Sequence, residues 1–118
     1  MRLPNAENAV LDIEKLRDYC LNPNHPEGKH KARVFFDKLG IRQNDAEDLR
    51  NAILEGVLVA EAVEQKQSSF GRRFVVDLVI SRGEGVVLSS ALVRTAWIIR
   101  EGEDFPRLTT CFCPQRSL

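Results

Sequence analysis

The side chains best suited to chemistry in this sequence are cations close to two histidines. A basic run, Lys29-His30-Lys31-Ala32-Arg33, follows a turn that contains His25. Cleavage of RNA without a metal needs a base, an acid and cations around the phosphate, and these residues are the raw materials for it. On a helical wheel centred on Ala32, however, His30 lies about 160° from the core direction, which predicts a solvated rather than a catalytic side chain. His25 stands between two prolines and is expected to order its loop.

Lys29 is a better candidate for an anion site than either histidine. On the same wheel it lies about 60° from the core direction, at the border between a helix and whatever the helix packs against. Gly28 permits close approach of an anion, and the first N–H groups of the helix are free to donate to it. The alternative is an ordinary capped surface helix without a ligand.

Two arginines of the second half form another part of the candidate site. Arg73 and Asp77 have the spacing that places both side chains on one face of a strand, and Arg94 is expected on the same face of the next strand. Asp77 and Arg94 can then pair across the strands, and arginine forks suit phosphate or carboxylate ligands. The alternative is a solvated face with one exposed ion pair. The candidate anion-binding or partner-binding residues are Lys29, Arg73, Asp77, Arg94 and Arg107.

Metals and cofactors receive little support from the sequence. The three cysteines, Cys20, Cys111 and Cys113, form an odd set that is typical of reduced thiols in a cytoplasm. Cys20 with His25 could complete a four-ligand zinc set, but the spacing of the ligands is not that of a zinc site. Since phosphate-binding loops and dinucleotide fingerprints are also missing, we predict no metal and no cofactor.

The elements that must position these residues change character near residue 60. Before it, apolar residues repeat at helical spacing and predict helices over about 13–21, about 29–39 and from Asn44 onward. After it, they alternate as in strands. The core face expected for the second helix is Ala32, Phe35, Phe36 and Leu39. The strands expected are 59–64, 72–81, 86–100 (as one strand or two) and 108–113, with a loop tip over 82–85.

These elements predict a single α+β domain over residues 1–118, with three N-terminal helices packed on one face of a four-stranded antiparallel sheet. The helical part covers about 1–58, the sheet about 59–113 and a tail 114–118. Trp97, the lone tryptophan, is expected as a core anchor rather than a platform for stacking bases.

Composition excludes several classes of protein. The chain has 118 residues, of which 43% are hydrophobic, and 17 basic residues balance 17 acidic ones. The hydrophobic content argues against a wholly disordered chain, and the balanced charge argues against strong non-specific binding to nucleic acid. The sequence has no apolar run long enough for a transmembrane helix and no hydrophobic signal region after Met1. We therefore expect a cytoplasmic protein that does not bind a membrane.

Three segments resemble a small, uncharacterised bacterial domain family: LPNAENAV, KLRDYCLNPNHPEGKHKARVFFDKLGI and TAWIIREGEDFPRLTTC. They carry a K-L-x-x-Y helix, an H-P-x-G-[KR]-x-K-A helix start and a late W…P-R-L-x-T strand. The order of elements, helices followed by four strands, is also similar, though more remotely, to that of the barnase, colicin and RelE group of small ribonuclease folds. The family's genes look like halves of two-gene units, which implies a small protein partner encoded nearby. The Cys-Phe-Cys-Pro near the end departs from the Tyr-Pro of related nucleases.

Two classes of function follow from these observations. The first is a non-catalytic interaction domain of a bacterial two-gene unit, comparable to one half of a toxin–antitoxin pair. The alternative is a metal-independent ribonuclease-like toxin of the barnase and RelE type, for which RNA would be the partner. The balanced charge favours the first class and the layout favours the second. The sequence leaves open whether the chain is an enzyme.

Overall fold

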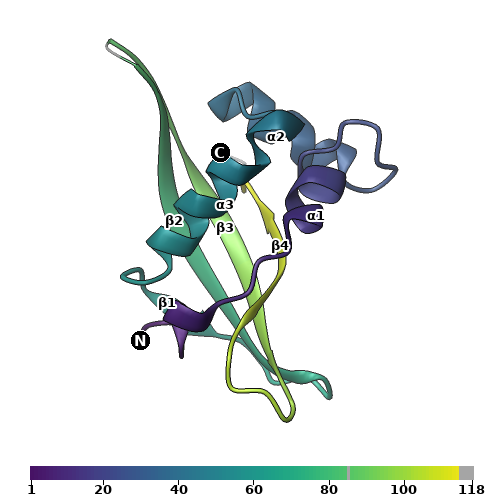
Figure 1. The fold of residues 1–118 in the computed structure, drawn as a ribbon, viewed down its shortest axis with the longest axis vertical. Helices are drawn as coiled ribbons and strands as arrows, with labels where there is room; N and C mark the ends of the chain where they lie inside the picture. Colours follow the sequence, from purple (N-terminus) through teal and green to yellow (C-terminus); the bar gives the residue numbers. More distant parts are fainter. Residues whose placement is uncertain (85, 115–118) are drawn as a thin grey trace.

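A layer of helices covers one face of a four-stranded antiparallel sheet (Figure 1). The computed structural model describes residues 1–84 and 86–114. The strands are β1 (Ala62–Glu64), β2 (Gly71–Glu84), β3 (Val87–Arg100) and β4 (Arg107–Phe112), and they lie in the order β1-β2-β3-β4. This arrangement confirms the predicted α+β class. No helix in the described part of the chain is long and apolar enough to cross a membrane.

The first helical segment begins with α1 (Ile13–Lys15) and continues as a π-helical turn over Leu16–Cys20. A short 3-10 turn (Ala6–Asn8) precedes it. Leu16 and Cys20 are buried, as the predicted helix over 13–21 requires. Asp12 occupies the N-cap position, but its side chain makes no capping hydrogen bond.

The second helix, α2 (Lys29–Leu39), has the predicted bounds, and Gly40 ends it with a positive φ of 65°. A left-handed residue at this position is a common helix stop, and glycine adopts it without a steric penalty. Phe35 and Leu39 are buried, but the Phe36 side chain is 45% exposed, so its predicted place in the core is wrong. The buried stripe of α2 is centred on the Phe35 side of the wheel, which leaves Phe36 at the border.

The third helix, α3 (Ala46–Gly56), follows a 3-10 turn over Gln43–Asp45. Leu49 and Ile53 are buried on its inner face. The Asp45 carboxylate accepts the Arg42 backbone N–H at 2.9 Å, which closes the turn that precedes α3.

Alternation along β2 places every second side chain in the core. Phe74, Val76, Leu78 and Ile80 are buried, as the sequence predicts. The predicted loop tip over 82–85 is wrong for residues 82–84, because β2 continues to Glu84 and Gly83 pairs with Leu88 of β3, while Gly85 lies outside the described residues. The predicted strand 86–100 is one strand rather than two, since β3 pairs with β2 without interruption from Val87 to Arg100.

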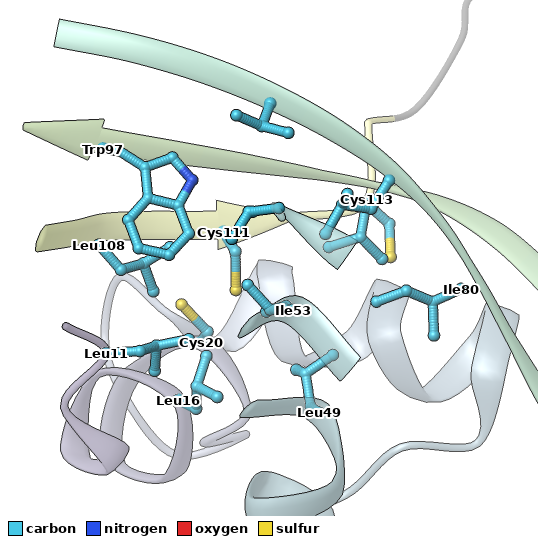
Figure 2. Close-up of a cluster of buried hydrophobic side chains, with 14 of the residues drawn as sticks. Leu11, Leu16, Cys20, Leu49, Ile53, Ile80, Trp97, Leu108, Cys111 and Cys113 are labelled. Atoms are coloured by element: carbon cyan, nitrogen blue, oxygen red, sulfur yellow. The ribbon is translucent and has the colours of Figure 1, made fainter. Parts of the chain in front are cut away.

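Trp97 anchors the core between the sheet and the helices (Figure 2). Its side chain is 1% exposed, and its indole Nε1–H donates to Thr95 Oγ1 at 2.8 Å. Thr95, itself fully buried, donates in turn to the Val76 carbonyl oxygen at 2.7 Å. The indole N–H of Trp97 and the hydroxyl of Thr95 therefore both have hydrogen-bond partners, as buried polar groups usually do. The prediction that Trp97 is a core anchor is confirmed.

Candidate functional site

Arg94 and Asp77 form the predicted cross-strand ion pair on the face of the sheet that the helices leave uncovered. The two residues lie opposite each other in the β2–β3 register. Arg94 donates to both carboxylate oxygens of Asp77, at 2.9 Å and 3.0 Å. These hydrogen bonds raise the pKa of the Arg94 guanidinium. Since both side chains are more than a third exposed, the pair contributes less than about 1 kcal/mol to stability.

Arg107 is also held by a carboxylate. It donates to both oxygens of Glu103 at 3.0 Å, and its guanidinium lies 4.9 Å from the centre of the Phe105 ring. The hydrogen bonds lower the pKa of Glu103 and raise that of Arg107. Arg73 is exposed and lies opposite Ile98 in the register. Arg94 and Arg107 are thus each paired with a carboxylate, and Arg73 is the third candidate arginine on this face of the sheet.

Lys29 does not join these arginines. It is the exposed first residue of α2, and α2 packs through Ala32, Phe35 and Leu39 against the buried face of the sheet. Arg73 and Arg94 project from the opposite face. The structure therefore does not bring Lys29 together with Arg73 and Arg94, because Lys29 begins a helix on one side of the sheet and the two arginines project from the other side.

A groove of about 820 Å³ runs beside α2 on the side away from the sheet. We call it the α2 groove. Its titratable lining residues are Lys29, His30, Arg33 and Arg42, and none of the described residues that line it is acidic. The rest of the lining is Leu21, Pro23, Ala32, Phe36, Ile41, Gln43 and Asn44. The groove therefore combines an apolar floor with a basic rim.

The helical repeat of α2 explains why these side chains meet. With 100° between successive residues, Phe36, Lys29, Arg33 and His30 follow one another around the same flank of the helix. Arg42 closes the groove from the segment after α2, and its guanidinium lies 4.8 Å from the centre of the Phe36 ring. This distance is typical of a cation–π contact. Arg33 lies 3.8 Å from Asp37, but both side chains are mostly exposed, so the arginine stays available to a ligand.

The sequence pattern singled out Lys29 as an anion-site candidate and included Arg33 in the basic run, but it did not single out Phe36 and Arg42 as contacts beside them in one groove. The helical wheel already indicated that Phe36 lies beside Lys29, because both residues fall on the same border of the apolar stripe. The prediction that His30 points away from the sheet is confirmed, since it is exposed and lines the α2 groove.

His25 orders the loop before α2, as predicted. Its Nδ1 accepts the backbone N–H groups of Glu27 and Gly28 at 3.0 Å and 2.9 Å. The imidazole also packs edge-on against Tyr19, with 4.8 Å between the ring centres. Gly28 fits closely under the same residue, because a Cβ atom there would overlap the Tyr19 carbonyl. The loop is thus closed by contacts that fix the imidazole of His25 through its Nδ1 atom and its ring.

The three cysteines are buried and not joined in a disulfide. The sulfur atoms of Cys20 and Cys111 point toward each other from the helical layer and from β4 (Figure 2). A hydrogen bond with Cys111 lowers the pKa of Cys20 to about 6, and the same contact raises that of Cys111. Burial raises the pKa of Cys113 to about 11. Within residues 1–84 and 86–114, no cluster of three or more His, Cys, Asp or Glu residues could hold a metal.

We expect none of the three thiols to react with a bulky disulfide reagent in the folded protein. Their burial makes access depend on local or global opening of the chain. In guanidinium chloride all three should react, and the absorbance of the released thiolate counts them. Native mass spectrometry should give the mass of the metal-free chain. Rapid reaction of even one thiol without denaturant, or a bound zinc ion, would contradict this expectation.

Comparison with known proteins leaves the activity open. A family model described as a domain of unknown function, DUF6883, matches residues 2–115. No curated protein and no solved structure matches the chain. The family match agrees with the resemblance to an uncharacterised small domain family.

Proposed function

We propose that this chain, a member of the DUF6883 family of unknown function, is a protein-interaction domain that binds an acidic segment of its partner in the α2 groove. One observation carries the proposal: the described titratable residues that line the groove are Lys29, His30, Arg33 and Arg42, above an apolar floor. Like charges gathered at one concavity attract a ligand of opposite charge and speed its encounter.

The chemistry of the groove defines the segment that would fit. Carboxylates of the partner would meet Lys29, Arg33 and Arg42, and an aliphatic or aromatic side chain between them would cover Phe36. Arginine and aromatic residues are the side chains that most often dominate binding energy at interfaces. The partner we propose is a small acidic protein encoded beside this one, in the cytoplasm of a bacterium, where the three thiols stay reduced.

The side chains that line the α2 groove suit the binding of a ligand better than they suit catalysis. A nucleophile or a histidine base is normally oriented by a third group. Among the described side chains, none donates a hydrogen bond to His30 or accepts one from it, and no carboxylate lines the groove. The groove therefore offers cations and apolar surface without an acid–base pair.

The alternative function is a metal-independent ribonuclease-like toxin. It is favoured by His30, which lies in the same groove as the cations that would surround a phosphodiester. Phe36, exposed beside them, would then stack on a base. The experiments below separate the two functions.

The proposal is tested with a short fluorescein-labelled peptide of Asp, Glu and Leu, followed by fluorescence anisotropy. We expect Arg42→Glu to weaken binding at least about tenfold, because it replaces an attractive charge at the groove by a repulsive one. Arg94→Glu is the matched control, since it makes the same change of charge on the opposite face of the molecule. Equal weakening by both variants would show non-specific charge attraction and overturn the proposal.

RNA cleavage is measured on the same proteins with a short single-stranded RNA. We expect the wild type and His30→Ala to leave the RNA intact, as an interaction domain would. Cleavage by the wild type that is lost in His30→Ala would establish the ribonuclease function in its place.

A further inference from the structure

Cys20 and Cys111 bring two thiols together from segments that lie far apart in the sequence. Cys20 ends the π-helical turn over Leu16–Cys20, and Cys111 belongs to β4, which packs against that turn. Figure 2 shows the two sulfur atoms pointing toward each other across the boundary between the helical layer and the sheet. The Cys113 sulfur lies apart from them in the same view. The fold therefore brings together two of the three cysteines.

This pair of thiols lies one side chain below the surface. Both cysteine side chains are fully buried, but Thr110, whose Oγ1 lies 3.9 Å from the Cys20 sulfur, is partly exposed. Tyr19 and Lys31 are also partly exposed, and the Lys31 ammonium donates to the Tyr19 hydroxyl at 2.7 Å. A bulky reagent is kept out by this cover, whereas a molecule little larger than water needs only a small local opening of it.

The groups around the pair favour one thiolate and one thiol at neutral pH. The hydrogen bond from Cys111, together with the positive charge of Lys31, lowers the pKa of Cys20 to about 6. The same hydrogen bond and burial raise the pKa of Cys111, which therefore keeps its proton. Since the thiolate is the nucleophilic form of cysteine, Cys20 is the better nucleophile of the two.

We propose that Cys20 and Cys111 form an oxidation site, at which hydrogen peroxide joins them in a disulfide bond between the helical layer and β4. In the first step the Cys20 thiolate attacks one peroxide oxygen, the O–O bond breaks, and the departing hydroxide takes up the proton that Cys20 released and leaves as water. In the second step the Cys111 sulfur attacks the sulfur of the resulting sulfenic acid. The S–O bond breaks, and the hydroxide leaves with the Cys111 proton as a second water. The two sulfurs lose two electrons, which reduce one peroxide to two waters.

Such a bond is compatible with thiols that are reduced in the resting state. Disulfides in reducing compartments are usually transient and redox-sensing, because cellular thiols open them again by exchange. While it lasts, the bond ties the turn before α2 to β4, and it closes a loop that contains most of the chain. The inference does not depend on what the α2 groove binds, because Cys20 and Cys111 are not among the residues that line the groove.

The test starts from the fully reduced chain, which is treated with hydrogen peroxide in native buffer and then alkylated in denaturant. We expect the loss of two alkylatable thiols and an intact mass lower by two hydrogen atoms, both reversed by dithiothreitol. Trypsin should release residues 18–29 linked to residues 108–116, and fragmentation between Phe112 and Cys113 should place the bond at Cys111. A bond at Cys113, or two thiols that stay free under peroxide, would overturn the proposal.

Cys113→Ser is the matched control, because Cys113 is buried and lies only two residues beyond Cys111. We expect this variant to form the disulfide as the wild type does, and Cys111→Ser to form none. If Cys111→Ser does not fold, the peptide map of the wild type decides by itself.

Stability provides a second readout, measured by urea unfolding followed by tryptophan fluorescence. The oxidised wild type should have an equilibrium constant of unfolding at least about tenfold lower than the reduced wild type, because the bond restricts the unfolded chain. Peroxide should give no such gain in Cys111→Ser. A disulfide that forms only in denaturant, or one that lowers stability, would show that the native packing does not hold the two sulfurs in bonding position and would overturn the proposal.

Discussion

Replacement of Trp97 by alanine is expected to lower the free energy of unfolding by about 3–5 kcal/mol. The indole is 1% exposed and lies between the sheet and the helical layer, so its removal leaves a cavity that the neighbours cannot fill. The variant also removes the donor that Thr95 Oγ1 accepts. Urea unfolding followed by circular dichroism measures the loss, since the variant no longer contains a tryptophan for fluorescence.

Trp97→Phe separates packing from hydrogen bonding at this position. The smaller ring keeps most of the buried surface and loses the N–H donor, while Thr95 still donates to the Val76 carbonyl. We expect a loss of about 1–2 kcal/mol, well below that of the alanine variant. If Trp97→Ala changed stability by less than about 1 kcal/mol, the side chain would not be the anchor of the core.

Phe35 and Phe36 provide a second prediction with a large expected effect, because two adjacent residues of one type have opposite environments. Phe35 is fully buried, whereas Phe36 is 45% exposed in the α2 groove. Phe35→Ala should lower the free energy of unfolding by about 3–5 kcal/mol, and Phe36→Ala by about 1 kcal/mol or less. Urea unfolding of the two variants, in the same buffer, measures the difference.

Peptide binding should be more sensitive to the replacement of Phe36 than to that of Phe35, which is the reverse of the order expected for stability. Phe36→Ala removes the ring that Arg42 covers and with it part of the apolar floor of the groove, so the acidic peptide should bind this variant several-fold more weakly. Comparable destabilisation by Phe35→Ala and Phe36→Ala would mean that Phe36 belongs to the core, as the helical pattern alone suggested. Unchanged peptide binding by Phe36→Ala would remove the ring from the proposed site.

Local patterns were sufficient for the parts of the fold that depend on neighbours in the chain. The bounds of α2 follow from an apolar repeat that ends at Gly40. The buried side of β2 follows from alternation, and the Asp77–Arg94 pair follows from placing both residues on the outward side of adjacent antiparallel strands. Each of these results depends on the geometry of a helix or of a strand pair, which repeats at a known interval.

The length of the hairpin could not be predicted in the same way. Arg82, Gly83 and Glu84 have the composition of a loop tip, yet all three belong to a continuous ladder with Ser89, Leu88 and Val87. Hydrogen bonds to a partner strand and the contact of Arg82 with Asp45 outweigh the local preference of glycine for a turn. These partners lie elsewhere in the chain, and only the folded structure brings them together.

The candidate site shows the same division between local pattern and tertiary structure. Periodicity placed Lys29 on the border of its helix and Arg73 and Arg94 on the outward side of their strands, and both placements are confirmed. It could not say that the sheet separates them, because a repeat describes the faces of one element and not the side of the sheet on which a helix packs. That choice depends on which apolar faces bury each other. The packing that buries Phe35 and leaves Phe36 exposed is also what brings Lys29, Arg33 and Arg42 together in one groove.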